Sequence, residues 1–80
     1  MNIASIKRLV EDFTISDLRA AEIALLNEQA PAIAVLGIDE GEQLTHVIAA
    51  IFVREQMNEH GTDMMTAMRD YASRVRQTLT

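Results

Sequence analysis

The sequence of 80 residues has no cysteine, no tryptophan, one proline and three glycines. Without cysteine, the chain can form neither a disulfide framework nor a thiolate zinc or redox site. Aromatic residues make up only 4% of the sequence, whereas 49% of it is hydrophobic, mostly Ala, Ile, Leu, Val and Met. Because Ala, Leu and Met favour helix over sheet, this composition predicts one compact all-α domain over residues 1–80 rather than a disordered chain.

The net charge of −5 opposes non-specific attraction to nucleic acid or to anionic lipid. Basic residues gather only near the C-terminus, where Arg69, Arg74 and Arg76 alternate with Asp63 and Asp70. That pattern is typical of a solvated helix face rather than of a nucleic-acid-binding patch. We therefore expect neither nucleic acid nor membrane as a partner.

Long uncharged runs are also missing. Residues 29–38 and 43–53 are each near ten residues long, against the roughly 18 needed to span a bilayer. Charged residues interrupt the first dozen positions before the apolar core of a signal peptide could form. These features predict a soluble cytoplasmic protein of bacterial type.

The apolar spacing predicts a first helix over about residues 3–12 and a second that ends at about Glu28. Ser16 is expected to be the N-cap of the second helix, with Asp17 in its first turn. Pro31 prevents the preceding residue from continuing a helix. Three to four helices are therefore expected in the bundle.

Residues 31–38, PAIAVLGI, read as a short extended connector. Ile33 and Val35 would point one way, and Ala34 and Leu36 the other. A lone strand has no pairing partner in this chain, so an extended connector would favour pairing with a second copy. A short helix beginning at Pro31 is the alternative interpretation.

A long helix is expected from about Glu40 to His60, with Asp39 as its N-cap and Gly61 as its left-handed C-terminal residue. Thr62 and Asp63 would then cap the last helix. For that helix we predict an exposed ion pair between Asp70 and Arg74 and an apolar stripe formed by Met65, Met68, Ala72, Val75 and Leu79.

The long helix has two apolar faces instead of one. One is formed by Leu44, Val47, Ile48 and Ile51, and the other by His46, Ala49, Ala50, Val53 and Met57. The chain's own helices cover both faces, or another molecule covers the second. We predict a homodimer, with His46, Ala49, Ala50, Val53 and Met57 as its interface, joined by Ile33 and Val35 if the connectors pair. An arginine at position 50 would then separate the copies.

Titratable residues give only weak candidate sites. Glu42 and His46 lie four residues apart on one side of the helix, a spacing that allows a hydrogen bond or two ligands of a metal. His46 and His60 are symmetric about Val53, so two antiparallel copies would bring them together as a metal or pH-sensing pair. Two ligands do not complete a site, and we favour a buried His46 satisfied by Glu42, Thr45 or a backbone carbonyl. No cofactor is expected.

Four methionines, Met57, Met64, Met65 and Met68, fall close to the turn between the last two helices. Met fills irregular gaps in cores and also lines adaptable binding grooves. Core filling is the favoured interpretation, and a peptide-binding groove is the alternative.

The stretch from Gly37 to His46 carries a G-x-D-x-G-E-Q-L-T-H pattern. In this pattern the chain resembles a small group of short bacterial proteins of unknown function. The resemblance implies a compact helical domain and no particular chemistry. We therefore predict a non-enzymatic, homo-oligomeric binding or accessory protein. The alternative is a small metal-binding or catalytic bundle that uses Glu42 and His46 and completes its site across a subunit interface.

Overall fold

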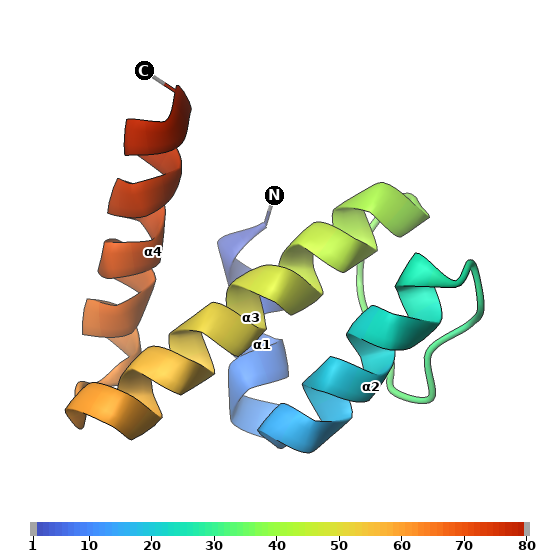
Figure 1. Cartoon of the computed structure of the whole chain (residues 1–80), viewed down its shortest axis with the longest axis horizontal. Coiled ribbons are helices and arrows are strands. Elements are labelled where there is room, and N and C mark those ends of the chain that lie inside the picture. The colour runs from blue at the N-terminus through green and yellow to red at the C-terminus, as the bar shows by residue number, and fades with distance from the viewer. Residues whose placement is uncertain (1, 80) are drawn as a thin grey trace.

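The computed structural model describes residues 2–79, and of the last two of these only the backbone. This range forms four helices and no strand: α1 (Ile3–Asp12), α2 (Ile15–Leu26), α3 (Glu40–His60) and α4 (Met64–Leu79). The molecule is flat, with extents of 31 × 29 × 19 Å. Figure 1 shows α3 running across the molecule, with the other three helices arranged around it. The predicted all-α bundle is confirmed.

Side-chain caps define where the helices begin. Asp39 caps α3 as predicted, since its carboxylate accepts a hydrogen bond from the backbone N–H of Glu42. The predicted cap of α2 at Ser16 is wrong. Thr14 caps α2 instead, because its hydroxyl accepts from the N–H of Asp17 while the Asp17 carboxylate accepts from the N–H of Thr14. This reciprocal box satisfies two otherwise unpaired donors and starts the helix at Ile15.

The second helix ends at Leu26, two residues before the predicted end. Asn27 is its C-cap, and Glu28 follows in the left-handed conformation with φ of 58°. The backbone N–H of Gln29 donates to the carbonyl of Ala24 and closes the helix end. This geometry is the usual left-handed helix termination, with a glutamate where glycine is commoner.

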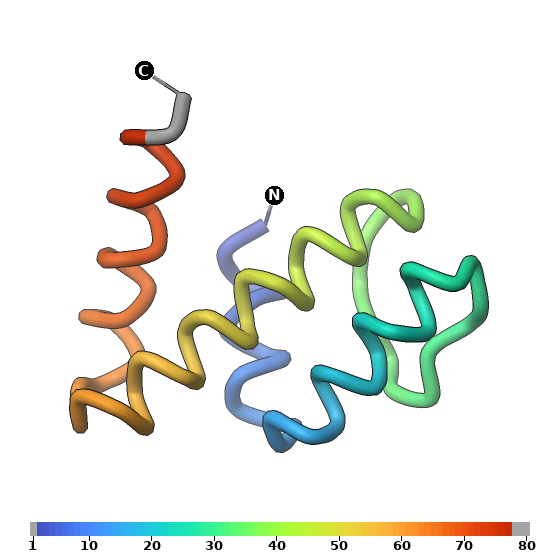
Figure 2. Tube along the Cα trace, viewed as in Figure 1, coloured from blue at the N-terminus to red at the C-terminus, as the bar shows by residue number. Residues whose placement is uncertain are grey.

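The core is built on α3, whose two apolar faces both pack against the same chain, although Ile48 on one of them is 43% exposed. The path of the backbone in Figure 2 shows α1, α2 and α4 at different sides of this helix. From the other helices the core receives Ile6, Leu9, Val10, Leu18, Ala21, Leu25, Ala67 and Met68, and from α3 it receives Val47, Ala49, Ala50, Ile51 and Val53. An ion pair between Arg19 and Glu55, 3.2 Å apart, lies at the edge between α2 and α3.

The predicted apolar stripe of α4 is confirmed at Met68 and Ala72 but not at Met65. Ala67 and Met68 are buried, whereas Met65 is 54% exposed. Met64 and Tyr71 pack against the core together with Ala67, so the buried side of α4 passes through these residues and Met65 lies outside it. The Tyr71 and Phe52 rings lie 5.5 Å apart. Val75 is half-buried, and the side chain of Leu79 lies outside the described residues.

Arg74, which was predicted to pair with Asp70, makes a contact between α4 and α3. Both residues are exposed, and the Arg74 guanidinium lies over the Phe52 ring at 5.2 Å from its centre. A cation held over an aromatic face at this distance is attracted by the ring quadrupole. Arg74 therefore helps to hold α4 against α3.

The connector, residues 31–38, forms neither a helix nor a strand. Ile33 and Val35 pack against the core, whereas Ala34 and Leu36 are exposed. The predicted alternation of side chains is confirmed without strand pairing. The alternative of a short helix at Pro31 is wrong, because the segment bends directly after the proline.

Asp63 gives a prediction about acid stability. Its carboxylate accepts from the N–H of Thr66 at 2.8 Å, and this bond, aided by the Thr66 side chain and by Arg69, lowers its pKa below the usual 3.8. Because the pKa is lower in the folded state, the stabilisation is complete above about pH 4 and is lost as the pH falls through the folded pKa. NMR titration of the Asp63 carboxyl should give a midpoint below 3.8.

The matched control is Asp63→Asn, which keeps a capping oxygen but has no titrating group. In the unaltered chain, the Thr66 amide should lose its protection from hydrogen exchange as the Asp63 carboxylate is protonated. In the Asp63→Asn variant, its protection should not change over that pH range. A carboxyl midpoint at or above 3.8 in the unaltered chain would contradict the capping account.

Candidate functional site

The stretch from Gly37 to His46 folds as a joint between the connector and α3. The Asp39 carbonyl accepts from the N–H of Gln43 at 3.0 Å, in addition to the cap made by its side chain. The Thr45 hydroxyl donates to the Gly41 carbonyl at 2.9 Å. The side chains of Asp39 and Thr45 therefore bond to backbone groups of the same stretch, which gives both residues a structural role.

Gly37 is required where the connector meets the first turn of α3. Its carbonyl accepts from the side-chain amide of Gln43 at 3.3 Å. A Cβ atom at position 37 would lie 2.8 Å from the Gln43 Cγ and 2.9 Å from its backbone nitrogen, closer than such atoms normally approach. Only glycine lets the two segments meet at this distance.

His46 is the fully buried centre of the joint. Its Nδ1 lies 2.7 Å from the Leu36 carbonyl, and its Nε2 lies 2.9 Å from the backbone nitrogen of Asn2. Since a backbone N–H can only donate, Nε2 must be the acceptor, and Nδ1 carries the proton that is donated to Leu36. One neutral imidazole thereby ties together α3, the connector and the start of α1.

Arg54 holds the opposite end of α1. Its guanidinium donates to the carbonyls of Val10 and Phe13 at 2.6 and 3.2 Å, where the last turn of α1 leaves carbonyls without helical partners. A cation also interacts favourably with the negative end of a helix dipole. His46 and Arg54 are eight residues apart, about 12 Å along the helix, so α3 fixes both ends of α1.

The predicted titratable residues do not converge on one point. Glu42 Oε1 lies 3.8 Å from His46 Nε2, which confirms that these two residues face each other. His60 is exposed at the far end of α3, where it lies 3.9 Å from the Glu59 carboxylate. Among the described residues, no group of three His, Asp or Glu side chains could hold a metal ion. Both nitrogens of His46 are already hydrogen-bonded in this conformation.

The residues predicted to form a homodimer interface lie inside the chain. His46, Ala49, Ala50 and Val53 are completely buried, and Met57 is partly buried. The interface was predicted there because this face of α3 needs a cover, which a second molecule would supply. The chain's own helices cover the face, so that reason no longer applies. An arginine at position 50 would bring a charge into the core, so this substitution does not serve as a test of association.

Three partners of the joint were not found from the sequence. Asn2 acts through its backbone N–H, and Leu36 acts through its carbonyl, so their side-chain types give no signal for these bonds. Arg54 looks like an ordinary surface cation, although it caps a helix 41 or more positions earlier in the chain. The sequence contains one weak signal for this cap. The last turn of α1 contains no basic residue, so its carbonyls are open to a cation from another part of the chain.

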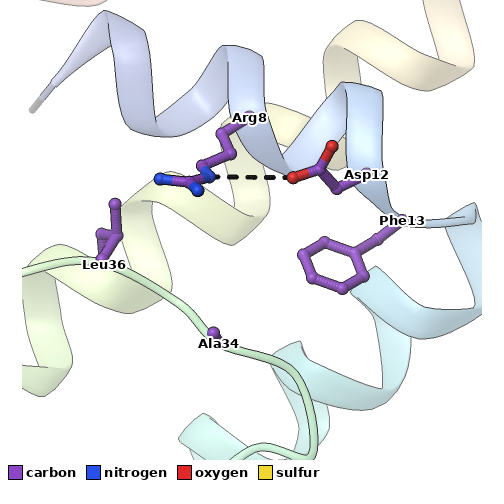
Figure 3. A pocket seen from close by; sticks show the side chains of 5 residues that line it. All are labelled: Arg8, Asp12, Phe13, Ala34 and Leu36. Carbon is purple, nitrogen blue, oxygen red and sulfur yellow. Dashed lines mark ion pairs between the residues drawn. The ribbon is translucent and has the colours of Figure 1, made fainter.

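Two open places on the described surface have partly apolar linings. The first, the connector groove, has a volume of about 320 Å³ and lies between the side chains of Arg8, Asp12 and Phe13 on one side and those of Ala34 and Leu36 on the other. Figure 3 shows the Phe13 ring facing the connector across this groove, with Arg8 and Asp12 paired on α1. The second, the α1–α4 cleft, has a volume of about 190 Å³ and is lined by Ile3, Met65, Met68, Arg69 and Ala72.

These features define a small helical protein in which a buried histidine and a tightly packed glycine fix the entry to the central helix. The chain belongs to a family of unknown function, DUF6952, whose model matches residues 1–80. The resemblance to a family without an assigned activity is thereby confirmed. Searches of curated proteins and of solved structures found no match. Within residues 2–79, no helix is both long enough and apolar enough to cross a membrane.

Replacing His46 with alanine tests the joint. The variant leaves the Leu36 carbonyl and the Asn2 N–H without their partner and opens a cavity in the core. We expect the free energy of unfolding to fall by about 2–4 kcal/mol. Urea titration followed by circular dichroism measures this change.

Thr45→Ala is the matched control, because Thr45 lies beside His46 but is exposed and makes one local bond. This variant should lose less than about 1 kcal/mol. Equal stabilities of the His46→Ala variant and the unaltered chain would show that the joint does not hold the fold together.

Proposed function

We propose that the protein is a non-enzymatic binding protein that works as a homodimer joined through its connectors. The supporting observation is that most backbone groups of the connector have no hydrogen-bond partner among the described residues. Within the described chain, none of the N–H groups from Ala32 to Ile38 donates a hydrogen bond to a protein group. Only the Leu36 and Gly37 carbonyls accept one, in both cases from a side chain of α3.

The exposed side chains of the connector support the same proposal. Leu36 is 51% exposed and Ile38 is 90% exposed, although both are large and apolar. Unpaired backbone beside exposed apolar side chains is a template for pairing with another chain. The predicted role of Ile33 and Val35 changes in this proposal, because both pack inward and hold the connector on the core.

A second copy is the occupant that this edge fits best. N–H and C=O groups alternate along an extended segment, so two such segments related by a two-fold axis satisfy each other in antiparallel pairing. Each copy would then bring its Leu36 or Ile38 side chain toward the connector groove of the other, where Phe13 offers an apolar surface.

The non-enzymatic part of the proposal rests on how the polar residues of the joint are used. Asp39, Gln43, Thr45 and His46 each bond to a backbone group of the same chain. A metal or a substrate at Glu42 and His46 would have to displace the Asn2 N–H from Nε2. A bacterial cytoplasmic setting, expected from the sequence, is part of this proposal.

Two connector variants test the dimer. Ala34→Pro removes one N–H from the edge, and a double variant with Leu36→Lys and Ile38→Lys places charges on it. Light scattering coupled to size-exclusion chromatography should show a dimer for the unaltered chain. Each variant should raise its dissociation constant at least tenfold, which corresponds to about 1.4 kcal/mol.

The control is Ile48→Lys, which adds a charge at another exposed apolar side chain, on α3. This variant should dimerise like the unaltered chain. Ala34→Pro should keep its stability within about 1 kcal/mol, since the N–H of Ala34 has no partner in the chain. A monomeric unaltered chain, or a dimer that persists in both connector variants, would contradict the proposal.

A further inference from the structure

The α4 helix is only partly packed against the rest of the chain. Its buried residues, Ala67 and Met68, lie in the first two turns, and its packing is mainly against α3. Figure 1 shows the later turns of α4 rising away from α3, on the side where the N-terminus of the chain lies. The α1–α4 cleft opens in this region, next to Ile3 at the start of α1.

The lining of the α1–α4 cleft has the form of a groove along a helix. Met65, Met68 and Ala72 follow one another at intervals of three and four residues, so they line one side of α4. Ile3 is 56% exposed and closes the groove from α1. The sequence also allowed the methionines to form an adaptable peptide groove, and Met65 and Met68 lie where such a groove needs flexible apolar side chains.

Charge indicates what kind of partner would fit. The α4 helix carries three arginines and one aspartate, a net charge of +2, while the rest of the chain carries −7. Arg69 lies in the cleft itself and is exposed. A second copy seated there through its own α4 would bring two basic helices together, whereas an acidic partner would be attracted.

We propose that the α1–α4 cleft binds an amphipathic helix of another protein, with its apolar face on Ile3, Met65 and Met68 and acidic side chains toward Arg69. Such a helix would extend the four-helix bundle by packing along the open side of α4. Helix-in-groove recognition of this kind places anchors at intervals of three and four residues, which matches the spacing of the lining residues.

The experiment uses a synthetic helical peptide of about 16 residues, long enough for four turns. It carries leucines at positions spaced by three and four and glutamates on both flanks. A twin peptide has lysine in place of every glutamate. Methionine methyl NMR of the full chain, labelled at methionine, reports which methionines each peptide touches.

We expect saturable shifts of the Met65 and Met68 methyl signals with the acidic peptide, and at least tenfold weaker binding of its basic twin. The Met57 signal should stay unchanged, because Met57 packs against the core and is not among the residues that line the cleft. The Met65→Glu variant should bind the acidic peptide at least tenfold more weakly. The control Ile48→Glu, which adds the same charge at another exposed apolar residue, should bind it normally.

Three results would overturn this proposal: no saturable shift, equal binding of the two peptides, or equal loss of binding in the Ile48→Glu control. A dimer that dissociates on Met65→Glu would assign the cleft to a second copy and would overturn it as well. Repeating the titration with the Ala34→Pro variant separates this proposal from the connector dimer, because the cleft should bind the peptide in either oligomeric state.

Discussion

The fold depends on two hydrogen bonds made by one buried imidazole. His46 donates from Nδ1 to the connector and accepts at Nε2 from the backbone N–H of Asn2, the residue that caps α1. The residues that each bond joins are far apart in the sequence, so forming the bond closes a loop of the chain. The joint must offset the conformational entropy that is lost when these loops close. With Arg54 on the carbonyl end of α1, these bonds turn a short helix, which would be marginal alone, into a fixed layer on α3.

This constraint explains the G-x-D-x-G-E-Q-L-T-H pattern of the chain. Gly37 lets the connector touch α3, Asp39 starts the helix, Gln43 and Thr45 return hydrogen bonds to Gly37 and Gly41, and His46 closes the joint. The polar side chains of this stretch are used to fold the corner. The binding surfaces that we propose therefore lie elsewhere, at the edge of the connector and along α4.

Local chemistry made much of this fold predictable. The charge pattern, the Asp39 cap and Gly61 placed α3 correctly, because capping depends on neighbouring residues. The double apolar face correctly indicated that α3 must be covered twice, but the sequence did not show which molecule covers the second side. The structure buries Ala49, Ala50 and Val53 under the chain's own helices.

Predictions failed where several local solutions compete. Thr14 and Ser16 can both cap a helix, and the reciprocal partner Asp17 decides for Thr14. Met65 fits a heptad stripe, but the buried side of α4 runs through Ala67 instead and leaves Met65 exposed. The burial of His46 and its bond to a backbone carbonyl were predicted, but Leu36 and Asn2 were not identified as its partners, because backbone groups have the same chemistry at every position.

The most direct test of the joint is a long-range nitrogen–proton NMR correlation spectrum of the histidine side chains, with exposed His60 as an internal reference. The account predicts that the ring proton of His46 is on Nδ1 and exchanges slowly, and that Nε2 carries no proton. A proton on Nε2, or rapid exchange equal to that of His60, would contradict it.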